Sequence, residues 1–232
     1  MNIAIMQPYL FPYLGYVQLM QAADIFVVYD NAQFMKGGWI NRNRILGATG
    51  VQTFTLQLSG ASANKKINEI DIGGNRAKIF RTLEQTYAKA PYGPETLDYV
   101  ERCFAFEDSN LARFTENSLR ELAGFLNIHA KFMTASHLEF DYQASAQDKV
   151  LSICEALDAT HYINAEGGRE LYDQPSFEAA GIKLRFLEHK PTEYSQFRRK
   201  GAFEPRLSVI DALANIGSKG VTELLNDFTL TR

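Results

Sequence analysis

The chain of 232 residues contains only two cysteines and four histidines, and it has no long apolar run. Cys103 and Cys154 each lie inside a helical pattern, so we expect buried, reduced thiols and no disulfide framework. No stretch is long and apolar enough to cross a bilayer. The chain starts on a strand-like segment, without a basic and apolar leader. We therefore expect a cytoplasmic protein with no membrane insertion.

The sequence also lacks an excess of positive charge. Its 24 Lys and Arg residues and 27 Asp and Glu residues give a formal net charge of −3. Bulk electrostatics therefore give no reason to expect DNA or an anionic membrane as a partner. No spacing of His, Cys, Asp or Glu matches a metal site, and neither a Walker A loop nor a G-x-G-x-x-G motif occurs. We expect no metal.

Short apolar strands alternate with helices along much of the chain. Strands are predicted at 2–6, 24–29, 130–134, 161–164 and 182–187, and helices at 15–22 and 145–157. This alternation is typical of βαβ units, so we predict an α/β protein with a mostly parallel, Rossmann-like sheet. A strand pair at 41–46 and 51–58 and a short strand at 67–72 are also predicted.

Residues 75–127 interrupt this alternation with an uninterrupted helical pattern. One helix is predicted from Asn75 to about Ala90, a second at 94–104 and a third over 109–125. We therefore expect a single α/β domain, residues 1–232, with an inserted helical block at about 75–127. A long irregular segment at 188–205 then precedes a helix that Ser208 caps, and a last short helix is predicted to reach about Asp227.

The turn after the first strand is the strongest local pattern. Two prolines and a glycine fix an unusual backbone path in the stretch Q-P-Y-L-F-P-Y-L-G-Y, residues 7–16. Gln7 ends an apolar strand, where a polar side chain is costly unless it is used. In open α/β sheets, ligands bind at such strand ends. Gln7, Tyr13 and Tyr16 are therefore candidate site residues, and plain packing of the aromatic rings is the alternative.

Tyr13-Leu14-Gly15-Tyr16 resembles in outline the H-x-G-H signature of nucleotidyltransferases and class I aminoacyl-tRNA synthetases. It follows the first strand and opens a helix, as that signature does. Tyrosine replaces both histidines here, and it donates a hydrogen bond without bringing positive charge at neutral pH. The resemblance therefore supports the fold more than the chemistry.

Polar residues also follow the second predicted strand. Asp30 stands where α/β proteins often contact a ribose, a metal or a substrate amine, and a turn or cap residue is the alternative. Beyond it, Lys36 and Arg42 supply positive charge and Trp39 offers a flat stacking surface. Strand alternation puts Asn41 and Asn43 on one face, with Arg42 and Arg44 on the other. An exposed polar hairpin is the alternative for this segment.

Three later positions complete the set of candidates. The turn Asn164-Ala-Glu-Gly167-Gly168 lies between a strand and a helix and is expected to present backbone amides to an anion. Asp211 belongs to a segment, 203–211, that we expect at the same sheet edge as the opening turn. His189 is a candidate acid or base, although nothing near it in sequence completes a triad.

Several stretches of the chain resemble the WbqC-like family. They are M-Q-P-Y-L-F-P-Y-L-G-Y, A-D-I-F-V-V-Y-D, K-G-G-W-I-N-R-N-R-I, Y-I-N-A-E-G-G-R-E-L-Y and F-E-P-R-L-S-V-I-D-A-L. The resemblance runs essentially from end to end. It implies a role in bacterial O-antigen or surface-polysaccharide biosynthesis, with transfer of a glycyl or other aminoacyl group to an amino sugar or nucleotide-sugar as the suggested activity.

That activity assigns roles to the candidate residues. Acylation of an amine needs an activated donor, a base and hydrogen-bond donors for the developing oxyanion. The expected catalytic residues are Asp30, Lys36, Arg42 and Tyr13. The expected substrate contacts are Gln7, Tyr16, Trp39, Asn41, Asn43, Asn164, Gly167, Gly168 and Asp211.

The implied donor is an activated aminoacyl group, carried by aminoacyl-tRNA or derived from ATP, with no resident cofactor. Two other functions stay open at this point. One is a nucleotidyltransferase-like enzyme that uses ATP. The other is a non-catalytic assembly protein that binds a sugar nucleotide.

Overall fold

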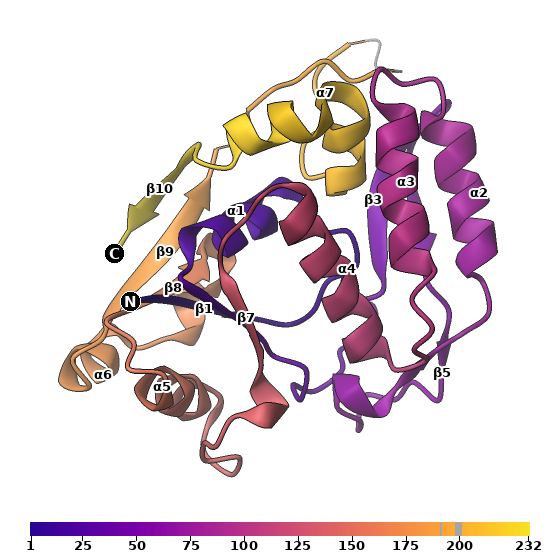
Figure 1. Cartoon of the computed structure of the whole chain (residues 1–232). Helices are drawn as coiled ribbons and strands as arrows, with labels where there is room; N and C mark the ends of the chain where they lie inside the picture. Colours follow the sequence, from indigo (N-terminus) through magenta and orange to yellow (C-terminus); the bar gives the residue numbers. More distant parts are fainter. Residues whose placement is uncertain (191, 198–200) are drawn as a thin grey trace.

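A computed structural model gives the fold and describes residues 1–190, 192–197 and 201–232 (Figure 1). Its centre is a six-stranded sheet in the order β10-β9-β8-β1-β2-β7. The strands are β1 (Asn2–Met6), β2 (Ile25–Val28), β7 (Lys131–Thr134), β8 (His161–Ala165), β9 (Lys183–His189) and β10 (Phe228–Thr231).

Five of these strands run parallel, and only β10 is antiparallel to its neighbour β9. From β1 the chain builds outward through β2 to β7, then returns to the other side of β1 and continues through β8 to β9. The direction of winding reverses between β1 and β8, as in doubly wound nucleotide-binding folds. The prediction of a mostly parallel, Rossmann-like α/β sheet is therefore confirmed, whereas β10 was not predicted.

Helices cover both faces of the sheet, which explains why β2 is buried throughout. Phe26 and Val28 pack in the cluster that contains α1 (Leu14–Ala22) and α7 (Val209–Leu224). Ile25 and Val27 pack in the opposite cluster, against α5 (Ala146–Ala156) and α6 (Gln174–Ala179). Alternate side chains of one strand thus serve two cores.

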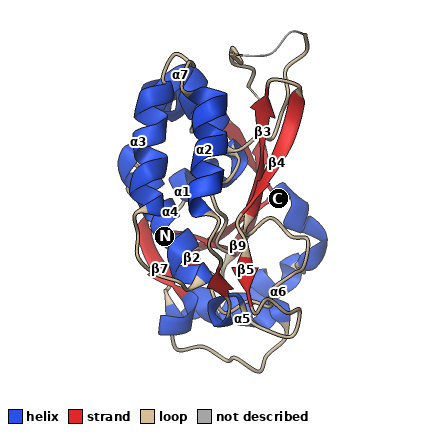
Figure 2. Cartoon of the chain, turned by 90° about the vertical axis from the view of Figure 1, so that its right-hand side faces the viewer, coloured by secondary structure: helices blue, strands red, loops and turns tan. Residues whose placement is uncertain are grey.

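The long segment between β2 and β7 forms a separate layer beside the sheet. It starts with the hairpin β3 (Arg42–Gly47) and β4 (Gly50–Thr55) and the short pair β5 (Leu58–Ser59) and β6 (Asp71–Ile72). The helices α2 (Arg76–Tyr87), α3 (Gly93–Phe104) and α4 (Leu111–Phe125) follow. Figure 2 shows α2 and α3 side by side, and α3 also contacts α7.

The described residues also form three short 3-10 helices: η1 (Ile67–Glu69), η2 (Ala135–His137) and η3 (Glu166–Leu171). The prediction of one strand over 67–72 was wrong in its first half. There the Glu69 carboxylate accepts a hydrogen bond from the backbone nitrogen of Lys66 at 2.8 Å. That bond caps the start of η1, and the backbone nitrogen of Ile70 closes its turn on the Ile67 carbonyl at 3.3 Å, which the local sequence pattern did not reveal.

The opening turn is held in place by residues that are distant in sequence. Phe11 is fully buried and adopts a φ of 47°, a left-handed conformation that is uncommon for a bulky residue. Its carbonyl accepts hydrogen bonds from Asn43 Nδ2 at 2.5 Å and from Ser208 Oγ at 2.7 Å. The backbone nitrogen of Val209 also donates to the Pro12 carbonyl at 2.7 Å. The turn is thus tied to β3 and to the start of α7.

We expect Ser208→Ala to lower the free energy of unfolding by about 2 kcal/mol, because Ser208 both caps α7 and binds the Phe11 carbonyl. Ser145→Ala is the matched control, since Ser145 is exposed and caps only α5. Its loss should be about 1 kcal/mol or less. Urea denaturation of both variants measures the difference, and equal losses would show that the bond to Phe11 contributes nothing.

Candidate functional site

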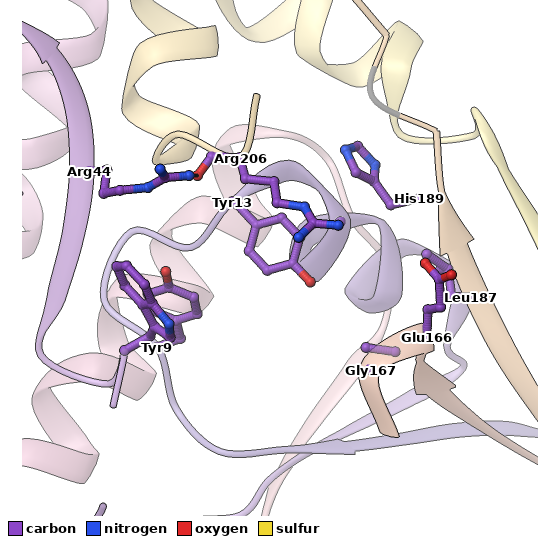
Figure 3. A pocket seen from close by; sticks show the side chains of 11 residues that line it. Tyr9, Tyr13, Arg44, Glu166, Gly167, Leu187, His189 and Arg206 are labelled. Atoms are coloured by element: carbon purple, nitrogen blue, oxygen red, sulfur yellow. Dashed lines mark hydrogen bonds between the residues drawn. The ribbon is translucent and has the colours of Figure 1, made fainter. Parts of the chain in front are cut away.

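A cavity of about 480 Å³ opens at the carboxyl ends of β1, β8 and β9 (Figure 3). It lies beside the point between β1 and β8 where the winding reverses, which is the usual ligand site of such sheets. We call it the switch-point cavity. The residues that line it are Tyr9, Tyr13, Gly15, Trp39, Arg44, Ala165, Glu166, Gly167, Leu187, His189 and Arg206.

Tyrosine rings from the opening turn form one wall of this cavity. The ring centroids of Tyr9 and Tyr13 are 6.4 Å apart, and Tyr16 meets Tyr9 edge-on at 5.8 Å. Burial raises the pKa of both Tyr9 and Tyr13. Both phenols therefore stay protonated at neutral pH and can donate hydrogen bonds into the cavity.

His189, at the end of β9, is held in one tautomer. Its Nδ1 lies 2.8 Å from the side-chain oxygen of Gln18, a residue of α1. The amide nitrogen of Gln18 donates to the carbonyls of Leu224 at 2.8 Å and Asp227 at 3.0 Å, so its oxygen must be the acceptor for His189. This network assigns the proton to Nδ1 and makes Nε2 of the neutral ring an acceptor, which has no hydrogen-bond partner among the described residues.

The surroundings of His189 also favour that neutral form. Its pKa is lowered first by burial and then by the positive charge of Arg206, against a smaller opposing effect of Asp227. An imidazole that is neutral at pH 7, oriented by a second residue and facing a cavity has the properties of a general base.

Arg206 brings positive charge to the same place. Figure 3 shows its side chain extending between Tyr13 and His189, with Glu166 across the cavity. Arg206 forms no ion pair with any residue that the structure describes. Its guanidinium is thus available to an anionic group or to a developing oxyanion.

Arg44 holds the backbone that carries Arg206. Its Nη2 donates to the carbonyls of Pro205 at 3.2 Å and Arg206 at 3.1 Å, and its Nη1 lies 3.9 Å from the Glu204 carboxylate. Arg206 itself has a φ of 57°. Arg44, on β3, therefore holds Arg206 in position just before α7.

Gly15 allows the closest packing in the cavity. A Cβ at this position would lie 2.5 Å from Cε2 of Tyr13 and 3.1 Å from Cβ of His189. Any larger residue would displace one of these two side chains. The glycine is therefore required by the approach of tyrosine and histidine to the helix start.

The structure brings three of the predicted site residues, Tyr13, Trp39 and Gly167, into the switch-point cavity. Arg42 lies at its edge, with its guanidinium carbon 4.9 Å from the centre of the Trp39 ring and a hydrogen bond to the Gly37 carbonyl. Lys36 is exposed and lies outside the residues that line the cavity.

Four other predicted residues are engaged with the fold itself. The Tyr16 hydroxyl donates to the backbone carbonyl of Gln7 at 2.7 Å, and the Gln7 side chain is half-buried. Asn41 Nδ2 donates to the Leu56 carbonyl at 2.7 Å, and Asn43 binds Phe11 as described above. None of these four residues is among those that line the switch-point cavity.

Asn164 and Gly168 form a compact turn behind Gly167. The Asn164 side-chain oxygen accepts from the backbone nitrogen of Ala165 at 2.7 Å. A Cβ on Gly168 would lie 2.5 Å from the Asn164 amide nitrogen, so this position has room only for glycine. The turn thus fixes how Glu166 and Gly167 face the cavity.

Asp211 is buried in α7 and binds the segment that leads to Arg206. Its carboxylate accepts from the hydroxyls of Tyr87 at 2.8 Å and Tyr194 at 2.9 Å, and from Gln196 Nε2 at 3.3 Å. Burial raises its pKa. Asp30 lies elsewhere, in a second cavity at the ends of β2 and β7.

Several residues that line the cavity were not among the candidates from the sequence, namely Tyr9, Glu166 and Arg206, and Arg44 was placed on a strand face without a role in the site. Tyr9 and Glu166 stand inside stretches that were singled out, and His189 was a candidate acid or base. Arg206 lies in a segment that was expected at this edge. The missing information was the convergence of β3, β9 and the start of α7, which no local pattern contains.

A model of the WbqC-like protein family matches residues 7–223. The chain belongs to the WbqC-like protein family. This confirms the resemblance found in the sequence. Its relatives include a protein of Mycobacterium tuberculosis (strain ATCC 25618 / H37Rv) that bears the name Uncharacterized protein Rv1507c. The two are 29% identical over 224 residues, which cover 94% of this chain and 95% of the relative. No solved structure matches significantly.

Two further features of this WbqC-like protein concern the described residues only. None of the helices there combines the length and apolarity needed to cross a membrane. In the same residues, no three or more side chains of His, Cys, Asp or Glu come together as metal ligands.

We expect Arg206→Gln to raise the pKa of His189 towards its ordinary value of about 6.5, because it removes a positive charge that disfavours the imidazolium. The pKa should stay below that value, since burial is the larger cause. NMR titration of the histidine ring signals measures the shift. His161 is the internal control, because its lowered pKa arises from burial and from Lys183 rather than Arg206. An unchanged His189 pKa would show that the charge of Arg206 does not lower it.

Proposed function

We propose that this WbqC-like protein transfers an acyl group, with a glycyl or other aminoacyl group as the leading case, to the amine of an amino sugar or nucleotide-sugar. The observation that carries the proposal is the neutral, oriented imidazole of His189 in the switch-point cavity. The link to bacterial surface-polysaccharide biosynthesis rests on the family resemblance and on no residue of the site.

The side chains of the cavity match the needs of such a transfer. The sugar amine attacks the carbonyl carbon of an ester donor, and the bond to the ester oxygen breaks. His189 Nε2 takes the proton that the amine loses and returns it to the departing oxygen. The hydroxyl of Tyr13 and the guanidinium of Arg206 stabilise the negative charge that develops on the carbonyl oxygen.

A nucleotidyltransferase-like reaction with ATP is the second candidate. It is favoured by the strand order and by Gly15 at the start of α1, which matches the glycine of the H-x-G-H outline. The Tyr16 position counts against it, since that hydroxyl is engaged with the Gln7 carbonyl rather than facing the cavity. Release of pyrophosphate from ATP, without any acyl donor, would favour this reaction over acyl transfer.

The direct test incubates the purified protein with glycyl-tRNA that carries radiolabelled glycine and with a set of UDP-linked amino sugars. Mass spectrometry then identifies any glycylated sugar. The rate should rise with pH through the lowered pKa of His189, because only the neutral ring accepts a proton. Absence of product from glycyl-tRNA with every UDP-linked amino sugar, alongside a folded protein, would reject glycyl transfer from tRNA to these sugars.

We expect His189→Asn to reduce the turnover number about 10²- to 10⁴-fold, the usual contribution of a general base. His129→Asn is the matched control, because His129 is exposed and precedes β7 at the opposite end of the parallel strands. The control should keep the rate of the unmodified protein. Full activity in His189→Asn would remove the residue from the mechanism.

A further inference from the structure

A second cavity of about 350 Å³ lies at the carboxyl ends of β2 and β7, against α4. We call it the Asp30 cavity. It shares no lining residue with the switch-point cavity. Asp30 lines it from the segment after β2 and Ser136 from η2, which follows β7, whereas Glu116, Asn117 and Arg120 line it from α4. The Asp30 cavity and the switch-point cavity are therefore separate from each other, although both lie at the carboxyl ends of parallel strands.

Asp30 is buried in the lining of this cavity, and only 4% of its surface is exposed. Its Oδ1 accepts a hydrogen bond from the backbone nitrogen of Ser136 at 2.9 Å. Its Oδ2 accepts from Ser136 Oγ at 2.6 Å and from Asn68 Nδ2 at 2.9 Å. A carboxylate offers about four acceptor positions, so these three bonds leave about one, on Oδ1.

No cation accompanies this carboxylate in the described part of the chain. The three donors to Asp30 are all neutral groups, and none of the ion pairs includes it. The other charged residues of the lining have their own partners. Arg120 lies 2.6 Å from Glu116, and Arg113 lies 2.6 Å from Asp108. Of the two acidic residues that line the cavity, Glu116 thus has a cationic partner, whereas Asp30 has none among the described residues.

The rest of the lining suits a ligand that carries hydroxyl groups. Asn117 is half-buried on α4, and its side-chain amide has no hydrogen-bond partner among the described residues. The exposed ring of His137 can donate or accept, and Phe106 adds an apolar surface. One charged contact, a few neutral polar groups and an aromatic side chain are what a small polar ligand requires.

We propose that the Asp30 cavity binds a compact, hydroxyl-bearing molecule through a primary ammonium group held by Asp30. An N–H of the ammonium takes the free acceptor position on Oδ1, and its charge balances that of the carboxylate. The single free position fits one N–H donor better than a metal ion, which needs several ligands. This site goes beyond the proposed function, and it holds whether or not the switch-point cavity transfers an acyl group.

The test uses D-glucosamine and ethanolamine as ammonium probes, with D-glucose and N-acetyl-D-glucosamine as neutral counterparts. Two-dimensional NMR of the full chain follows the backbone amide of Ser136 and the side-chain amide of Asn117 during titration. We expect saturable shifts of both signals with the two amines. Affinity for D-glucose and N-acetyl-D-glucosamine should be about ten-fold lower or more, since a hydrogen bond to a charged group is lost.

Two variants localise the binding. Asp30→Asn keeps the size of the side chain but removes its charge, and should weaken glucosamine binding about ten-fold or more. Asn117→Ala removes a side chain that the fold does not use, so it keeps the protein folded and should weaken glucosamine binding several-fold. Equal affinity for glucose and glucosamine, unchanged affinity in Asp30→Asn, or no shift with either amine would overturn the proposal.

His189→Asn separates this proposal from the proposed function. That variant should bind glucosamine as the unmodified protein does, while losing acyl transfer. Amine binding at Ser136 without any transfer activity would reject the proposed function alone. Shifts confined to Tyr13 and His189 would instead place the amine in the switch-point cavity and overturn the Asp30 site.

Discussion

The carbonyl oxygen of Phe11 is the contact on which the site depends. One backbone atom accepts hydrogen bonds from Asn43 on β3 and from Ser208 at the start of α7, while Phe11 itself stays in a left-handed conformation. Without partners, a buried carbonyl and a strained residue would together cost a few kcal/mol. Because the partners come from two remote segments, the opening turn, the hairpin and α7 form as one unit. These bonds to the Phe11 carbonyl therefore help to bring together three residues of the cavity, Tyr9, Tyr13 and Arg206.

The central sheet was predictable because its signal is local. β1 and β2 are short runs of apolar residues buried on both faces, and each is followed by a turn or a helix. β10 was not predictable in the same way. Its residues are partly or largely exposed, and it forms a strand only because the edge of β9 is available for pairing. Tertiary context, rather than propensity, decides such an element.

The candidate site was predictable only as a set of strand ends. Asp30 and Tyr13 follow neighbouring parallel strands, yet the structure places them in separate cavities. Tyr16 is buried behind the first cavity, where its ring meets that of Tyr9 edge-on at 5.8 Å and its hydroxyl binds the Gln7 carbonyl. A strand pattern says at which edge a side chain emerges. It does not say which neighbouring loop or helix divides that edge into compartments.

The side-chain amide of Gln18 links His189 in the switch-point cavity to the turn that follows α7. Its nitrogen is held by the carbonyls of Leu224 and Asp227, and its oxygen holds the Nδ1 proton of His189. The backbone carbonyls at the end of α7 and in the turn before β10 thus determine which nitrogen of the His189 ring carries the proton, although they lie some forty residues further along the chain. The turn between α7 and β10, which lies outside the residues that line the switch-point cavity, therefore fixes the amide orientation that keeps the proton on Nδ1.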